Sequence, residues 1–117
     1  MRHDRYDCNF GCPVEADLEV LGGKWKGLIL FHLLESSRRF NDLRRLLPDV
    51  TQRMLTRQLR ELETDGIVAR QVFAEVPPHV EYSLTDFGES LAPVLSALQK
   101  WGEVYLDQRQ ALLDVDA

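Results

Sequence analysis

The sequence has few cysteines, no long apolar run and no targeting segment. Cys8 and Cys12 are its only cysteines in 117 residues, which is too few for a typical secreted disulfide scaffold. No apolar stretch approaches the roughly 18 residues that suggest a membrane span. Residues 1–7 also lack the apolar core of a signal peptide. We therefore expect a reduced, cytoplasmic, single-domain protein with no membrane partner.

Motifs for catalysis and for tight metal binding are also missing. The chain has no dinucleotide loop, no H-E-x-x-H motif and no Ser–His–Asp pattern with usable spacing. Gly22, Gly23 and Lys24 lack the rest of a phosphate loop, and His32 stands alone among apolar residues. We expect no enzyme activity, no cofactor and no metal. A metal site built from Cys8, Cys12 and His3 is the alternative, but it lacks the usual paired ligand spacing.

Charge is unevenly distributed along the chain. The formal net charge is −5 at pH 7, which argues against indiscriminate binding to polyanions. Residues 38–60 nevertheless hold seven arginines against two aspartates, whereas residues 86–117 hold six acidic residues against two basic ones. One end of the domain can therefore face phosphate while the other faces solvent or a partner. An ordinary solvated surface is the alternative.

Hydrophobic periodicity and turn residues predict a mainly α-helical domain with one small β-hairpin. Residues 1–12 form an arm with both cysteines, and residues 13–117 form a single domain. We expect helices over residues 13–21, 24–35, 40–47 and 51–65, the third with Leu46 facing the core. Two strands, 67–74 and 80–84, follow around Pro77 and Pro78. A last helix, capped by Thr85, covers about 85–110. This order predicts a winged helix-turn-helix with extra N- and C-terminal dimerisation helices.

The helix over residues 51–65 has the polar face of a DNA-reading helix. Leu55, Leu59 and Leu62 lie on one stripe, and Thr51 is a good N-cap. The other side then presents Gln52, Arg53, Thr56, Arg57 and Arg60. Arginine pairs bidentately with guanine, and glutamine with adenine, in the major groove. The pattern indicates binding to double-stranded DNA. A solvated surface helix with Glu–Arg pairs is the alternative.

Further basic residues flank this helix. Arg38, Arg39, Arg44 and Arg45 lie upstream, where contacts to the DNA backbone would add affinity rather than sequence preference. At the turn of the hairpin, His79 follows two prolines. We interpret His79 as a contact to a phosphate or to the minor groove. A rigid turn that makes no contact is the alternative.

Several stretches resemble the HxlR family of winged-helix transcription regulators. They are Lys24-Trp25, residues 39–43, residues 54–63, Asp65-Gly66, residues 76–78, and residues 80–85 with Gly88. The resemblance extends from about Cys12 to Trp101. It implies a homodimer built from the first and last helices, with two reading helices on a near-palindromic operator.

The last helix independently indicates a dimer. It carries an apolar stripe formed by Leu91, Leu95, Leu98, Trp101 and Tyr105. This is more exposed apolar surface than a monomer of this size normally shows. Packing of the stripe on the protein's own core is the alternative.

The N-terminal cysteines raise the question of sensing. Cys12 directly precedes Pro13 at a helix start, a position that favours the reactive thiolate. It also matches the place where HxlR-type regulators often carry a cysteine that senses oxidants or electrophiles, and Cys8 matches it less clearly. Cys12 is therefore our candidate sensor and Cys8 a second one. Passive thiols are the alternative.

The sequence as a whole predicts a sequence-specific transcription regulator. A dimer that covers a promoter needs no further surface to block polymerase, so we expect a repressor. The competing class is a winged helix that serves as a protein-interaction module without DNA binding. Such modules usually lose the basic face, which Arg53, Arg57 and Arg60 retain here.

Overall fold

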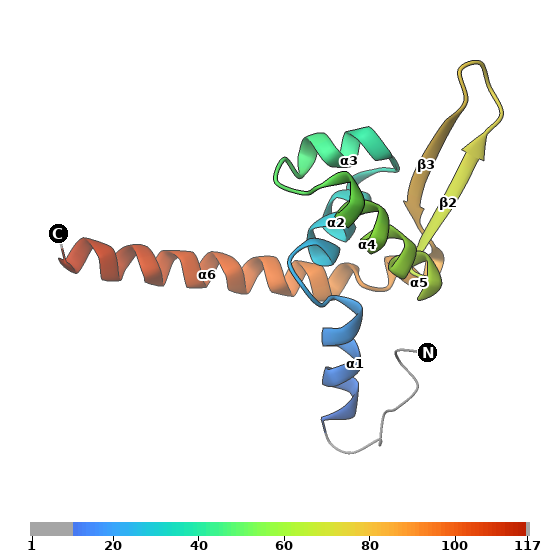
Figure 1. Cartoon of the computed structure of the whole chain (residues 1–117). Coiled ribbons are helices and arrows are strands. Elements are labelled where there is room, and N and C mark those ends of the chain that lie inside the picture. Colours follow the sequence, from blue (N-terminus) through green and yellow to red (C-terminus); the bar gives the residue numbers. More distant parts are fainter. Residues whose placement is uncertain (1–10, 117) are drawn as a thin grey trace.

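The computed structural model describes residues 11–116 and is mainly helical, as expected. Its elements follow the order α1 (Cys12–Val20), α2 (Trp25–Glu35), β1 (Arg38–Arg39), α3 (Phe40–Leu46), α4 (Gln52–Thr64), β2 (Val68–Phe73), β3 (His79–Leu84), α5 (Asp86–Glu89) and α6 (Ala92–Asp116) (Figure 1). Helices α2, α3 and α4 gather beside the β2–β3 hairpin, while α1 and α6 extend away from them (Figure 1). This is the winged helix-turn-helix arrangement.

The core is centred on α2. Ile29 and Leu30 of this helix are completely buried, together with Leu43 of α3 and Leu55 of α4. Most of α2 faces other elements of the fold, which explains why this helix is apolar over much of its circumference although Leu28 and Glu35 remain exposed. The expectation that Leu46 faces the core is wrong, since its side chain is exposed. Helix α3 ends at Leu46, and the following Leu47 takes the buried place instead.

Local sequence signals fix both ends of α4. The Thr51 Oγ1 accepts a hydrogen bond from the Met54 N–H at 3.0 Å, which satisfies one of the donors left unpaired at a helix start. After the helix, Gly66 adopts a φ of +77°, a conformation that favours glycine. Between these ends, Leu55, Leu59 and Leu62 are buried in the core. The structure confirms the predicted N-cap at Thr51, the buried stripe of leucines and the end of the helix at Gly66.

The sheet has one strand more than the sequence predicts. Strands β2 and β3 pair as the expected antiparallel hairpin, and β1 adds to the free edge of β3. Arg38 lies opposite Tyr82, and Arg39 lies opposite Glu81. A strand of two residues is too short to show an alternating pattern, so only its partner β3 reveals it. The third strand fastens the base of the hairpin to the helices.

The expectation of one continuous last helix is also wrong. Thr85 caps the short α5 instead, accepting from the Gly88 N–H at 2.9 Å and donating to the Gly66 carbonyl at 2.6 Å. A Cβ at Gly88 would lie only 2.1 Å from the Ile67 carbonyl oxygen, so glycine lets α5 approach Ile67, which directly precedes β2. Pro93 is the second residue of α6. Because proline has no N–H to continue the hydrogen bonding of α5 but is well tolerated in a first helical turn, a new helix begins there.

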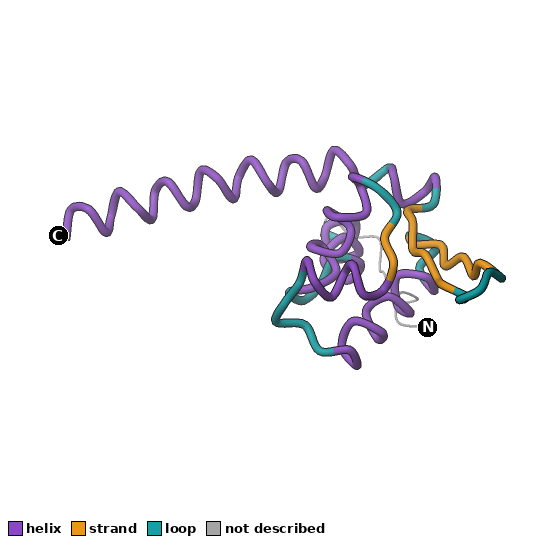
Figure 2. The backbone as a smooth tube through the Cα atoms, turned by 90° about the horizontal axis from the view of Figure 1, so that it is seen from above, coloured by secondary structure: helices purple, strands orange, loops and turns teal. Residues whose placement is uncertain are grey.

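Helix α6 is far longer than the body against which it begins. Its 25 residues start beside α2 and then project well beyond the other elements (Figure 2). Leu95 in its first turns is buried in the core. Within residues 11–116, no helix combines the length and the apolar character needed to cross a membrane.

Candidate nucleic-acid interface

The outward side of α4 forms one continuous polar surface. The five residues expected there line a single shallow hollow together with Glu61; they are Gln52, Arg53, Thr56, Arg57 and Arg60. Four of the five are exposed, and Thr56 is half-buried. The Thr56 Oγ1 donates to the Gln52 carbonyl at 2.8 Å, which leaves its oxygen lone pairs as acceptors. The structure thus brings together the whole predicted set on α4.

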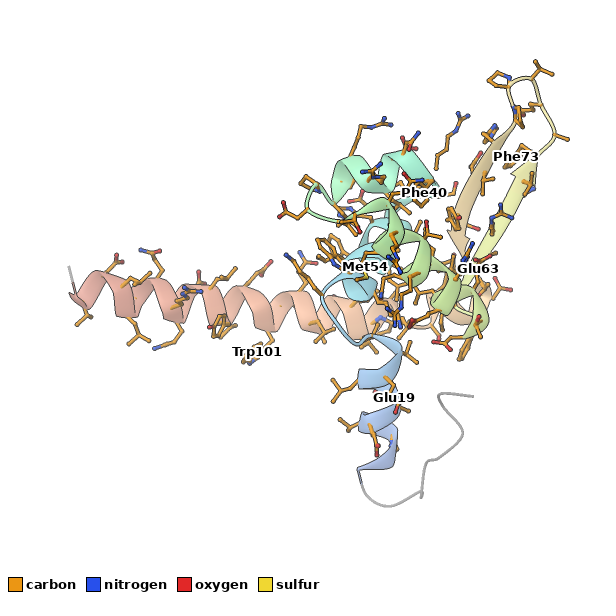
Figure 3. The ribbon with its side chains drawn as sticks, in the orientation of Figure 1. Glu19, Phe40, Met54, Glu63, Phe73 and Trp101 are labelled. Atoms are coloured by element: carbon orange, nitrogen blue, oxygen red, sulfur yellow. The ribbon has the colours of Figure 1, made fainter. Side chains whose placement is uncertain are left out.

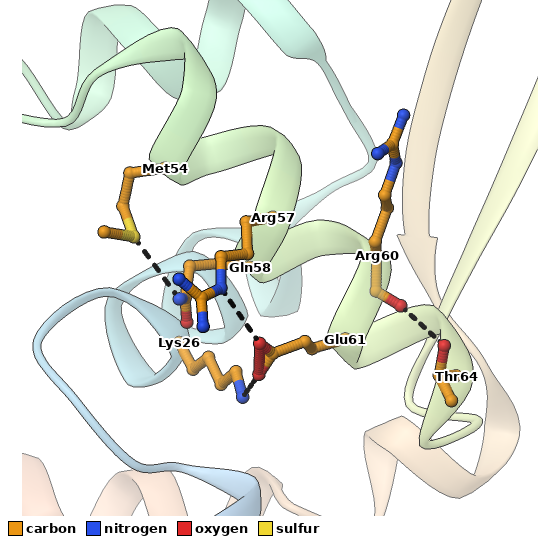
Figure 4. A network of polar contacts seen from close by, with 7 residues as sticks. All are labelled: Lys26, Met54, Arg57, Gln58, Arg60, Glu61 and Thr64. Atoms are coloured by element: carbon orange, nitrogen blue, oxygen red, sulfur yellow. Dashed lines mark hydrogen bonds and ion pairs between the residues drawn. The ribbon is translucent and has the colours of Figure 1, made fainter.

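The arginines of α4 differ in how strongly they are held. Arg57 lies 3.6 Å from Glu61 through its Nε. Glu61 in turn accepts a hydrogen bond from Lys26 of α2 at 2.6 Å. In the described part of the chain, the guanidinium groups of Arg53 and Arg60 have no ion pair. Arg60 points away from Glu61, toward the hairpin (Figure 4).

A second hollow lies between α4 and the hairpin. Arg60 lines it from one side and Arg70 of β2 from the other, with Gln52, Thr56 and Tyr82 among its remaining residues. The sequence prediction missed Arg70. An exposed arginine in the strand that follows the reading helix is the signal that could have found it. Arg70 extends the basic surface from α4 onto the hairpin.

The four upstream arginines divide into two pairs. Arg39 and Arg44 are exposed and form no ion pair with any described residue. Arg38 is bound to Glu35 at 2.8 Å, and its Nε donates to the His32 carbonyl at 3.4 Å. Arg45 is paired with Asp42. Arg39 and Arg44 are therefore the cations best placed to meet a new anion, whereas Arg38 ties β1 to α2.

His79 is held within the hairpin instead of extending from it. Its ring stacks on Phe73 with centroids 4.6 Å apart. Its two ring nitrogens lie 3.4 Å from Glu75 and 2.9 Å from Glu81. Only 12% of the side chain is exposed. These contacts show that His79 stabilises the hairpin; its contact to DNA stays a prediction.

The polar surface of α4 and the hairpin lies apart from the exposed side chains of α6. The labelled Phe40, Met54 and Phe73 belong to α3, α4 and the hairpin, whereas Trp101 projects from α6 on the other side of the body (Figure 3). The polar hollows lie along α4 and the hairpin. The basic surface and the long helix α6 thus occupy separate parts of the fold.

Comparison with known proteins identifies the family of this chain. Residues 20–110 match the family model described as HxlR-like helix-turn-helix. The chain belongs to the HxlR-like helix-turn-helix family. Among its relatives, the HTH-type transcriptional regulators YdeP and YybR of Bacillus subtilis are 57% and 58% identical, over 84% and 80% of this chain and 77% and 74% of theirs. The relatives are regulators of transcription, which confirms the expectation that the chain is not an enzyme.

Solved structures agree with this assignment. The redox regulator HypR in its reduced form is 54% identical, has a TM-score of 0.80, and covers 85% of this chain and 98% of its own. The reduced form of the regulator YodB from Bacillus subtilis is 37% identical, with a TM-score of 0.71 over 78% of this chain and 89% of its own. The chain is thus a transcription regulator with an HxlR-like winged helix.

The apolar stripe of this HxlR-like chain divides between two environments. Leu95 is buried in the protein's own core, and Leu91 packs against that core. Leu98, Trp101 and Tyr105 are exposed, with the two aromatic rings stacked at 5.7 Å. The prediction of a single intermolecular stripe is therefore wrong for Leu95, because α6 needs this residue to anchor its first turns. Beyond Tyr105, the sequence prediction missed further exposed apolar residues, namely Leu106, Leu112, Leu113 and Val115.

The candidate sensor residues lie at the margin of the structure. Cys12 is the first residue of α1 and precedes Pro13 in its first turn, as expected. Cys8 lies outside the described residues, as do His3 and the side chain of Cys12. Within residues 11–116, no group of three or more histidine, cysteine or acidic residues could hold a metal ion.

Proposed function

We propose that this protein is a cytoplasmic, sequence-specific transcription regulator that binds double-stranded DNA as a homodimer on a near-palindromic operator. The observation that carries the proposal is the outward side of α4. Its polar residues line one open hollow while its leucines are buried. A reading helix needs this division, because its exposed side chains must reach base edges while the helix stays fixed to the body.

The basic residues take different parts in this function. Gln52, Arg53 and Arg57 read base edges in the major groove, where glutamine and arginine have matching donor and acceptor patterns. Arg39 and Arg44 hold the phosphate backbone. The hairpin lies along the flanking DNA with Arg70 as its cation, while His79 keeps its tip in shape and contacts the backbone or minor groove.

Helices α1 and α6 supply the dimer contacts. Each exposes large apolar side chains; they are Val14 and Leu18 on α1, and Leu98, Trp101, Val104, Tyr105, Leu112 and Leu113 on α6. Such an extended apolar surface is typical of a protein–protein interface. A symmetric pair of these helices would set the spacing between two copies of α4. A dimer that covers a promoter excludes polymerase, so we assign repression to it.

The decisive experiment is selection of bound duplexes from a random or genomic DNA pool. We expect enrichment of a sequence with two related half-sites, because two-fold protein symmetry is mirrored in the operator. Binding to the enriched duplex should weaken steeply as salt rises, since phosphate contacts release counterions. No enrichment, or affinity that does not change with salt, would instead favour a protein-interaction module.

We further propose that Cys12 makes binding responsive to oxidants or electrophiles. This proposal is supported by the likeness to HypR, a redox regulator whose oxidised form is 57% identical over 80% of this chain. Modification of a thiol at the start of α1 would move α1 and change the spacing of the two α4 helices. Gel shifts with diamide or methylglyoxal should show loss of binding in the wild type, and retained binding in Cys12→Ser. An equal response in both proteins rejects the proposal, and Cys8→Ser tests the second thiol.

A further inference from the structure

One lysine is buried on the mainly apolar helix α2. Lys26 lies on α2 with only 4% of its surface exposed. A buried ammonium group is costly unless a partner of opposite charge is close. Its Nζ lies 2.6 Å from the Oε1 of Glu61, so the partner is a carboxylate on α4. The charge of Lys26 is therefore directed at the reading helix from inside the protein.

The same carboxylate reaches the DNA-facing surface. Its other oxygen, Oε2, lies 3.6 Å from the Nε of Arg57, whose side chain is 72% exposed. Figure 4 shows Glu61 between the two basic groups, with one contact on each side. We call Lys26, Glu61 and Arg57 the α2–α4 bridge. It connects the buried core to a residue that lines the outer hollow of α4.

The geometry of the bridge limits how Arg57 can meet a base. The guanidinium group is a planar fork with donors on Nε and on both Nη atoms. Glu61 approaches the Nε side, so this contact leaves the two Nη groups available to another acceptor. Two parallel donors at the end of the fork match the O6 and N7 acceptors of guanine. A contact on the Nε side therefore favours an end-on approach of Arg57, the approach that suits a guanine.

Lys26 also compensates the negative charge that Glu61 places on α4. A carboxylate on the outer face of α4 would repel DNA phosphates, and unpaired it would also be free to move. Lys26 compensates its charge at 2.6 Å and fixes its position. An acidic residue can therefore remain on a DNA-facing helix and act on its arginine neighbour instead of on the DNA.

We propose that Glu61, anchored by the buried Lys26, is a positioning residue that sets the base preference of Arg57. This inference rests on the proposed DNA-binding function. Glu61 does not contact DNA in this arrangement. It acts by restricting the orientations of Arg57, so its removal should lower sequence discrimination more than overall affinity.

The test uses the full-length protein and the operator duplex recovered by the selection described above. Affinity is measured for that duplex and for a set of duplexes that each carry one substituted base pair. Glu61→Gln should lose about fivefold or more of its discrimination at one guanine of each half-site, the range that a good bidentate contact provides. Arg57→Ala should lose discrimination at the same base pair. Adding Glu61→Gln to Arg57→Ala should cause no further loss.

Two further variants keep the test decisive. Asp49→Asn removes an exposed acidic charge just before α4, and should change affinity for all duplexes to a similar degree. If Glu61→Gln unfolds because Lys26 is left unpaired, Lys26→Met with Glu61→Gln removes both charges together, which is far less costly. The double variant should then show the same loss of discrimination.

Results that contradict the role of Glu61 can be told apart from results that contradict DNA binding. If the wild type enriches no DNA sequence, DNA binding itself is refuted. If the wild type enriches an operator but a folded Glu61 variant raises or lowers affinity uniformly, like Asp49→Asn, the positioning role of Glu61 is refuted. Loss of discrimination that adds to the loss caused by Arg57→Ala also refutes it.

Discussion

Helices α4 and α6 are both amphipathic, but they use their apolar sides differently. In α4, Leu55, Leu59 and Leu62 are at most 1% exposed. Among the described side chains of α6, only Leu95 is buried, whereas Trp101, Leu106 and Leu112 each leave more than half of their surface exposed. The apolar side of α4 is covered within one chain, and that of α6 is not. In the proposed function, α4 therefore acts through its polar side and α6 through its apolar side.

Under the proposed function, this difference separates DNA reading from dimerisation within one small chain. A rigid reading helix requires its buried side to be complete in each protomer, so that exposed side chains keep their positions. A helix that forms a dimer must leave its apolar side uncovered in the single chain, because another copy covers it. Mutations in α4 should therefore act on the protomer or on DNA, and mutations in the distal part of α6 should act on assembly.

The largest effect is expected from a cavity under α4. Leu59→Ala removes a buried side chain from the core and should lower the free energy of unfolding by about 2–5 kcal/mol. Urea unfolding at several protein concentrations measures it. The matched change Leu112→Ala on α6 should cost less in dilute protein, and its cost should depend on concentration because Leu112 belongs to the proposed dimer interface. If both variants lose the same free energy of unfolding at every protein concentration, the proposed difference between α4 and α6 is wrong.

A charge on the apolar side of α6 should separate the protomers. Trp101→Glu places a carboxylate among exposed apolar residues, where an unpaired charge opposes burial. In sedimentation experiments, we expect the mass to fall to that of one 13.5 kDa chain, with operator affinity falling in parallel. Gln110→Glu is the control, since position 110 is half a turn out of phase on the same helix. A monomeric wild type, or dissociation by both changes, would refute the assigned interface.

A smaller and more selective effect is expected on the polar side of α4. Arg57→Ala should reduce discrimination at one base pair by about 1–3 kcal/mol, as expected for the loss of a bidentate contact. The thermal unfolding midpoint should hardly change, because Arg57 is exposed. Fluorescence anisotropy on matched and substituted duplexes measures the difference. A uniform loss on all duplexes would make Arg57 a backbone contact instead.

The parts of the fold that the sequence predicts correctly have local causes. Thr51 caps α4, the leucine stripe buries one side of that helix, and Gly66 ends it. Each depends on side chains within a few residues of one another, and the exposed polar face follows from the buried one. This is why the sequence alone predicts which residues lie on the outward side of α4.

The parts that the sequence prediction missed depend on residues far apart in the chain. β1 exists only because β3 offers a free edge, and Arg70 reaches the surface of α4 only when the hairpin folds back on the helices. Lys26 looks like an isolated charge on an apolar helix until Glu61, 35 positions away, is placed beside it. The burial of Leu95 likewise depends on where α6 crosses the core.

The smallest expected effect concerns the edge of the basic surface. Arg44 is exposed on α3 and unpaired among the described residues, so we expect it to hold a phosphate without reading a base. Arg44→Ala should weaken binding to all duplexes alike and reduce the slope of log affinity against log salt by about one unit per protomer. Arg109→Ala, which removes the same charge from the distal part of α6, should leave the slope unchanged. If both changes lower the slope equally, the basic surface does not end at the body of the protein, and α6 contributes to DNA binding as well as to assembly.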